Sequence, residues 1–244
     1  MPRFFIDKQE ITDGVITLAG EDASHIAQSL RMAVGEHLTL CDGEGCDYEG
    51  ELVTLSREEV TVKVLSSQSS ESEPAYPVRL YQCLPKGDKL ETVIQKAVEC
   101  GVYEIVPVQS SRCIVKMKPE DVKKKLVRYN RIAEEAAKQS GRGVIPTVRA
   151  PLSYKEAVRE LAVCGLSFIC YENESGMTIS SALRAVEVPA SVGFLVGPEG
   201  GLSADEVAFA KENGVASLSL GKRILRTETA APFVLAILSA FFEL

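Results

Sequence analysis

The hydrophobic period changes near residue 77, and this change constrains the fold more than any other feature of the sequence. Before it, apolar and polar positions alternate over short runs, the pattern of half-buried strands, at 15–18, 37–41, 48–55 and 60–65. After it, strand-like runs alternate with helical periods, which is typical of a mostly parallel sheet covered by helices, at 78–84, 105–108, 166–171, 192–196 and 217–220. The Ser-rich segment 66–74 predicts a linker. The sequence therefore predicts a small β-rich domain, a candidate barrel, followed by an α/β domain.

Capping residues and apolar periodicity predict the helices. In the first domain, Asp22 or Ser24 caps a short helix with Ile26 and Leu30 on one face. In the second domain, helices are expected at 88–100, 120–138, after 153, near 179, after 203 and from 227. The helix from 227 is apolar on nearly every side, so it must be covered all round. A core explains part of that cover, and a subunit interface explains the remainder.

Charge is distributed unevenly along the chain. The net charge of −7 by itself discourages a nucleic-acid partner, because phosphate binding requires lysines and arginines. Residues 75–150, however, carry 15 Lys and Arg against 8 Asp and Glu, whereas residues 1–74 carry 5 against 15. RNA contacts are therefore expected on the middle third, although a solvated helical face at 116–125 accounts equally well for part of the excess.

Several protein classes are disfavoured by residue usage. The seven cysteines include no C-x-x-C pair and the chain has only two histidines, so neither a disulfide framework nor a metal site is expected. The longest apolar stretch, 230–242, is shorter than the roughly 20 residues that span a bilayer, and no signal peptide is expected at the N-terminus. We therefore expect a cytoplasmic protein without a membrane partner.

Two strand-to-helix junctions carry candidate ligand loops. The first contains Gly197, Gly200 and Gly201, which let the backbone turn sharply and approach a ligand closely, although a plain tight turn explains the glycines alone. The spacing matches neither nucleotide-phosphate fingerprint. The second junction, 221–226, places three cations in five residues before a helix N-terminus, and a solvated turn explains Arg226 poorly. Ligands of parallel sheets bind beyond the carboxyl ends of the strands, where both loops are expected.

These loops resemble a known family. Leu-Val-Gly-Pro-Glu-Gly-Gly-Leu-Ser at 195–203 and Leu-Gly-Lys-Arg-Ile-Leu-Arg-Thr-Glu-Thr-Ala at 220–230 resemble the two C-terminal signatures of the SPOUT methyltransferases, specifically of the RsmE family. Segments 86–89, 95–102 and 135–142 resemble its upstream motifs, and residues 25–35 resemble its N-terminal RNA-binding module. The resemblance covers nearly the whole chain.

The resemblance implies a fold and an activity. The fold is a PUA-like β-barrel over 1–70 and a SPOUT α/β domain over 71–244 that is tied in a trefoil knot, which folded chains almost never contain. The implied partners are a second copy of the chain, forming a homodimer, and small-subunit ribosomal RNA, either free or in the assembled subunit. The implied activity is methylation of uridine N3 in 16S ribosomal RNA with S-adenosylmethionine and no metal.

The implied chemistry selects candidate catalytic residues. Uracil N3 must lose its proton before it accepts a methyl group, and negative charge then spreads onto O2 and O4. Arg226 and Arg142 are the candidate cations, because a guanidinium bonds two acceptors and keeps its charge. Glu199 and Glu228 are candidate catalytic carboxylates, each acting as a base or holding a loop.

The binding residues follow from the same resemblance. The cofactor is expected at three strand ends, against Glu172, Leu195, Val196, Gly197, Glu199, Gly200, Gly201, Leu220, Gly221, Ile224, Leu225 and Thr229. RNA is expected at Arg31, Lys86, Lys89, Lys96, Arg112 and Arg142.

Two alternatives belong to other function classes. A related SPOUT enzyme could methylate a ribose hydroxyl or a transfer RNA base, but the N-terminal module and the set of motifs argue against it. A non-catalytic RNA-binding or assembly factor would have a vestigial cofactor site, and the intact Gly197, Gly200, Gly201, Gly221 and Arg226 argue against that.

Overall fold

The computed structural model describes all 244 residues and divides into two compact units. Unit 1 contains Met1–Glu73 and Ala137–Ile145, and unit 2 contains Pro74–Ala136 and Pro146–Leu244. The division is therefore not a single cut in the sequence, since a nine-residue segment from the middle of the chain completes unit 1. No helix is long and apolar enough to cross a membrane.

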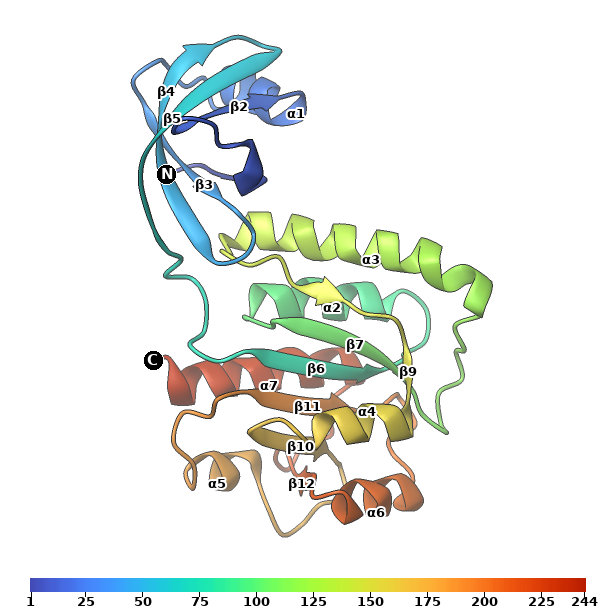
Figure 1. Ribbon diagram of the computed structural model, residues 1–244. Helices are drawn as coiled ribbons and strands as arrows, with labels where there is room; N and C mark the ends of the chain where they lie inside the picture. The colour runs from blue at the N-terminus through green and yellow to red at the C-terminus, as the bar shows by residue number, and fades with distance from the viewer. The chain divides into compact units, whose positions relative to one another are not determined.

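Unit 1 is a five-stranded sheet with the strand order β1-β3-β4-β5-β2 (Figure 1). The strands are β1 (Arg3–Phe5), β2 (Val15–Ala19), β3 (His37–Cys41), β4 (Cys46–Leu55) and β5 (Glu59–Ser69). Neighbours pair antiparallel except β1, which pairs parallel with β3. Three short helical segments connect them, η1 (Lys8–Glu10), α1 (Glu21–Ser24) and the π-helical η2 (His25–Ser29).

Alternating residues of these strands form the core of unit 1. Ile16, Leu38, Leu52 and Val62 are almost fully buried, as the period-two pattern predicts. Ile26 joins this core, whereas Leu30, expected on the same apolar face, is 39% exposed because the helical segment ends at Ser29.

The Ser-rich segment differs from its predicted role as a linker. Ser66 to Ser69 belong to β5 and pair with Glu49 to Cys46 of β4. The side chains of Ser66–Ser69 are exposed, so no apolar pattern marks them as a strand, but their backbone continues the ladder with β4.

Glu73 and Arg142 attach the segment 137–145 to unit 1. The Glu73 carboxylate accepts hydrogen bonds from Nε and Nη2 of Arg142, at 2.8 and 2.6 Å, and from the backbone N–H groups of Gly143 and Val144. Burial raises the pKa of Glu73, but the hydrogen bonds and charge of Arg142 outweigh it, so the net pKa lies below the ordinary value. The backbone N–H of Gly45 also donates to the Gly143 carbonyl. These contacts explain why 137–145 belongs to a unit that otherwise ends at residue 73.

Unit 2 is a parallel sheet with helices on both faces. Its strand order is β12-β10-β11-β6-β7-β8, with β9 also paired to β7, and every pairing is parallel. The strands are β6 (Val78–Cys83), β7 (Glu104–Gln109), β8 (Thr147–Val148), β9 (Leu152–Ser153), β10 (Leu166–Cys170), β11 (Val192–Val196) and β12 (Ala216–Leu218). All five residues of the central β11 are buried, as expected for a strand covered on both sides.

Six helices belong to this part of the chain. They are α2 (Lys89–Glu99), α3 (Pro119–Ser140), α4 (Tyr154–Leu161), α5 (Ile179–Leu183), α6 (Ala204–Glu212) and α7 (Thr227–Phe242). In Figure 1, α4 lies in front of the sheet, and α2 and α7, which contact each other, lie behind it. Capping boxes begin α4 at Ser153, α5 at Thr178 and α6 at Ser203.

Candidate cofactor-binding site

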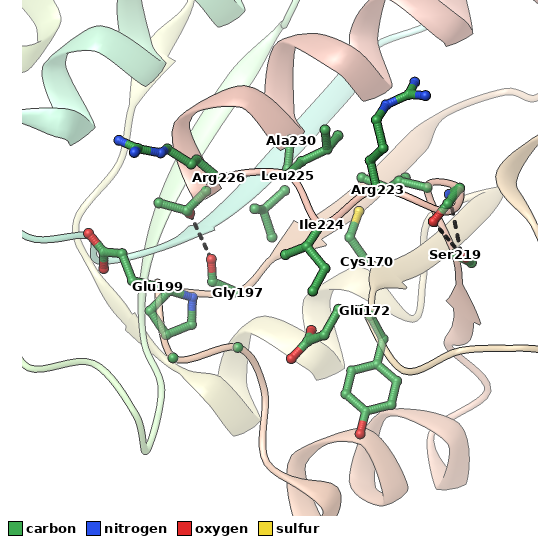
Figure 2. Close-up of a pocket in the computed structure, with 18 of the residues that line it drawn as sticks. Cys170, Glu172, Gly197, Glu199, Ser219, Arg223, Ile224, Leu225, Arg226 and Ala230 are labelled. Carbon is green, nitrogen blue, oxygen red and sulfur yellow. Dashed lines mark hydrogen bonds between the residues drawn. The ribbon is translucent and has the colours of Figure 1, made fainter.

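A pocket of about 620 Å³ lies at the carboxyl ends of β10, β11 and β12 in unit 2 (Figure 2). Three loops form it: Tyr171 and Glu172 after β10, residues 197–201 after β11, and residues 219–226 before α7. This volume is within the range of about 300–1,000 Å³ that small-molecule sites usually have. The two junctions that the sequence singled out therefore border one cavity, at the edge where parallel sheets bind ligands.

The glycines of the loop 197–201 allow neighbouring atoms to approach its backbone closely. Gly201 has φ +65°, and a Cβ on it would collide with the Glu172 carboxylate. A Cβ on Gly197 would lie 3.3 Å from the carbonyl carbon of Gly201 and from Cγ of Leu202. The left-handed backbone at Gly201 therefore favours glycine, and a side chain there would also displace the Glu172 carboxylate.

Most of the expected cofactor residues line the pocket, and two do not. Those that line it are Glu172, Val196, Gly197, Glu199, Gly200, Gly201, Leu220, Gly221, Ile224 and Leu225. Leu195 is fully buried in β11, and Thr229 is exposed in the first turn of α7. In Figure 2, Cys170 and Glu172 lie on one side of the pocket, and Glu199 and Arg226 lie on the other.

Thr227 is a pocket residue whose contacts the sequence did not reveal. The N-cap of α7 is Arg226, without a side-chain capping bond, so Thr227 is the first residue of the helix. The Thr227 hydroxyl instead donates to the Gly197 carbonyl at 2.7 Å and accepts from Nε2 of Gln82 at 2.9 Å. No local pattern could have shown this, since the partners lie 30 and 145 residues away.

Lys89 joins the two candidate carboxylates at the pocket. Its ammonium lies 3.1 Å from Oε1 of Glu199 and 3.4 Å from Oε2 of Glu228. The backbone N–H of Lys86 donates to the same Glu199 oxygen at 3.0 Å. Lys89, which the sequence predicts to contact RNA, lines the pocket. Glu228 does not line the pocket but forms an ion pair with Lys89.

Arg226 also lines the pocket, but its side chain is 82% exposed. Its one ion pair, to Glu228, is long at 4.0 Å. The guanidinium is therefore available to a ligand or substrate that approaches the open side of the pocket.

Arg142 has a different setting from the one the sequence suggested. It is 3% exposed, does not line the pocket, and pairs with Glu73 inside unit 1. A sequence pattern cannot show a partner 69 residues away. A direct contact of Arg142 with uracil or RNA phosphate would require this buried ion pair to open.

The other expected RNA contacts fall into two groups. Arg112 donates to the Gly200 carbonyl at 2.9 Å, and Lys96 pairs with Glu99 at 2.8 Å. The side chains of Lys86 and Arg31 are exposed and have no protein partner. Lys86 and Arg31 are therefore the two free cations of the expected set. The structure contains no group of three or more side chains that could hold a metal ion.

Comparison of the chain with known protein families identifies the class to which it belongs. An RNA methyltransferase domain model matches residues 71–239, and an RNA methyltransferase PUA domain model matches residues 18–65. The chain is thus an RNA methyltransferase in which a PUA domain precedes the catalytic domain.

Whole-chain relatives specify the family further. Ribosomal RNA small subunit methyltransferase E of Bacillus subtilis is 35% identical, over 100% of this chain and 98% of that protein. The protein of the same name from Mycobacterium tuberculosis is 32% identical, over 95% and 88%. The crystal structure of the Neisseria gonorrhoeae protein of this name, bound to S-adenosyl methionine, has a TM-score of 0.82 at 32% identity, over 99% and 98% of the two chains. This chain belongs to the ribosomal RNA small subunit methyltransferase E family.

Proposed function

We propose that this protein, an S-adenosylmethionine-dependent methyltransferase of small-subunit ribosomal RNA, acts on N3 of a uridine in 16S ribosomal RNA. The observation that carries the proposal is that the two loops that resemble the family signatures border one pocket, together with Tyr171 and Glu172. The RNA-binding domain is proposed to cover residues 1–70 and the methyltransferase domain 71–244, which the two domain matches support.

The residues of the pocket fit a molecule with the mixed chemistry of S-adenosylmethionine. Val196, Leu220 and Leu225 supply apolar surface for a base, and the Glu172 carboxylate, pressed against Gly201, supplies an acceptor for hydroxyl or ammonium groups. When bound, the cofactor supplies a sulfonium-activated methyl group, which the N3 electron pair takes as the N3 proton is lost.

Arg226 is proposed to stabilise the deprotonated uracil. Its exposed guanidinium at the pocket can meet O2 or O4, where the charge of the anion lies. Because the guanidinium is always protonated, it favours the anion without taking a proton itself. The other residues of the site are proposed to position the reactants, so that uracil N3 lies in line with the methyl group of the cofactor.

The phosphates of the RNA are proposed to contact the free cations. Lys86 and Arg31 have exposed side chains without carboxylate partners, in contrast to Lys96, which is paired. Such contacts orient an RNA without reading its sequence. The excess of acidic residues in 1–74 means that the first domain provides few of them.

Further proposals concern the chain path and assembly. A trefoil knot is proposed from the family resemblance, and the contact of Thr227, at the start of α7, with Gly197 closes one loop of the kind that a knot requires. A homodimer is supported by a stripe on α7 that its own chain leaves partly uncovered, formed by Phe233, Ile237 and Phe241.

Mapping methylated nucleotides tests the proposed function. Small-subunit RNA and assembled subunits from cells lacking the protein are incubated with it and S-adenosylmethionine. One new N3-methyluridine in 16S RNA is expected, in one or both substrates. Methylation of another atom or of transfer RNA would instead indicate a related enzyme, and cofactor binding without methylation of any RNA would indicate an assembly factor.

A further inference from the structure

Lys89 forms ion pairs with two carboxylates, Glu199 and Glu228, which differ in the hydrogen bonds that they accept. Glu199 and Glu228 both lie within 3.4 Å of the Lys89 ammonium. Their side chains are 27% and 21% exposed, so burial does not distinguish them. The hydrogen bonds that each one accepts do.

One oxygen of Glu199 accepts two hydrogen bonds. Its Oε1 receives both the backbone N–H of Lys86 and the ammonium of Lys89. Burial raises the pKa of Glu199, but these hydrogen bonds outweigh it and keep the pKa below the ordinary value. A carboxylate held in its charged form in this way is a poor proton acceptor. Glu199 therefore serves to hold Lys89 and the loop at Lys86.

Glu228 has one oxygen that is buried and accepts no hydrogen bond. This atom, Oε2, is near Lys89, but the two do not form a well-directed hydrogen bond. The charged groups around Glu228 are Lys89 of α2 and Arg226 at the start of α7, with Glu199 on the far side of Lys89. A buried acceptor without a donor is costly, and an incoming N–H group would satisfy it.

We propose that Lys89 is a positioning residue of the methyltransferase site, which keeps Glu199 engaged and directs the open oxygen of Glu228 to the N3–H of the target uracil. This rests on the proposed function. The N3–H bond breaks and its proton passes to Glu228 and then to water. The N3 electron pair bonds the methyl carbon, while the electron pair of the breaking carbon–sulfur bond goes to the sulfur, which leaves as a thioether. Lys89 provides the fixed charge that positions the Glu228 side chain beside the pocket.

This role differs from a contact between Lys89 and RNA phosphate. A phosphate-binding lysine extends into solvent and releases counterions from the RNA when it neutralises a phosphate, whereas Lys89 already has two carboxylate partners within its own chain. Lys86, three residues earlier, has the free side chain that the phosphate role requires. The two roles make opposite predictions for salt dependence and for the rate of methylation.

The test compares Lys89→Met, Lys89→Arg, Lys86→Met and a control, Lys211→Met. Lys211 pairs with Glu174 at 3.2 Å on the surface and does not line the pocket. RNA affinity is measured against salt concentration, and single-turnover methylation is measured at saturating RNA and cofactor. Lys89→Met is expected to lower the rate on the order of 10²-fold and leave the salt slope unchanged. Lys86→Met should lower the salt slope by about one, whereas the control Lys211→Met should change neither the slope nor the rate.

The conservative variant and the carboxylates complete the test. Lys89→Arg keeps the charge and is expected to recover at least about tenfold of the lost rate. Glu228→Gln should lower the saturated rate by on the order of 10²-fold or more, and by clearly more than Glu199→Gln does. A normal saturated rate in Lys89→Met, or a reduced salt slope, overturns the inference while wild-type N3 methylation leaves the proposed function intact. Absence of N3 methylation by the wild type overturns the proposed function itself.

Discussion

The side-chain hydroxyl of Thr227 donates a 2.7 Å hydrogen bond to the backbone carbonyl of Gly197. The same hydroxyl accepts a hydrogen bond from Gln82, a fully buried side chain of β6. One oxygen atom therefore connects the first residue of α7, the glycine loop after β11 and the strand next to β11. This connection fixes the position of the glycine loop, 197–201, relative to the loop 219–226 that leads into α7.

Removal of the Thr227 hydroxyl should destabilise unit 2. Thr227→Val keeps the volume but leaves the Gly197 carbonyl without this donor, so the free energy of unfolding should fall by about 1–3 kcal/mol. Thr229→Val, an exposed position in the same helical turn, should change it by less than about 0.5 kcal/mol. Denaturant unfolding of both variants measures the difference, and equal stabilities would remove the structural role of Thr227.

Arg226 should contribute to turnover rather than to binding. Arg226→Ala is expected to lower the single-turnover rate on the order of 10²–10³-fold, with cofactor and RNA affinities nearly unchanged, because the contact forms mainly in the transition state. Arg226→Lys should recover only part of the loss, since lysine lacks the planar fork. If Arg226 binds RNA or holds the loop instead, affinity will weaken and the saturated rate will survive.

A side chain at Gly200 should leave the fold intact but block binding of the cofactor in the pocket. A Cβ on Gly200 would be 3.5 Å from Cβ of Arg112, an ordinary contact, so Gly200→Val should fold. S-adenosylmethionine should raise the thermal midpoint of the wild type and fail to raise that of the variant. Gly214→Ala is the matched control: its φ of +81° makes the substitution unfavourable, but it lies outside the pocket, so the ligand-induced shift should remain.

The ion pair of Glu73 should make the stability of unit 1 depend on pH. Because the folded-state pKa of Glu73 is lowered, its contribution is complete above the unfolded value near 4.5 and is lost as the pH falls through the folded value. Glu73→Gln should lower the free energy of unfolding by about 3–5 kcal/mol at pH 7, because the buried Arg142 guanidinium loses the opposite charge of Glu73. The difference from the wild type should shrink below pH 4.5, whereas the exposed Glu71→Gln should behave like the wild type throughout. Unfolding curves between pH 3 and 7 measure both.

The regular elements could largely be predicted because local signals determine them. The bounds of β3 and β11 match the predicted runs, and α4 and α6 begin directly after Ser153 and Ser203. The two-residue strands β8 and β9 and the three-residue β1 were missed, because such short segments show no period. Ser66–Ser69 were taken for a linker because a strand with exposed polar side chains has no hydrophobic signature.

For the site, the sequence identified the loops better than the roles of charged side chains. Glycines and strand ends determine where a pocket forms, and ten of the twelve expected cofactor residues line it. Whether a cation is free depends on partners distant in sequence. The sequence predicts that Arg142 and Lys89 contact RNA, but they form ion pairs with Glu73 and Glu199, which lie 69 and 110 residues away in the sequence.

The return of residues 137–145 to unit 1 has a consequence for synthesis of the chain. Residues 1–73 leave the ribosome before the segment that pairs with Glu73 and Gly45, and all of 74–136 is made in between. The N-terminal unit therefore cannot complete its folding as a nascent chain until β6, α2, β7 and most of α3 have been translated. A truncated gene ending at residue 73 would yield a fragment that lacks its closing segment.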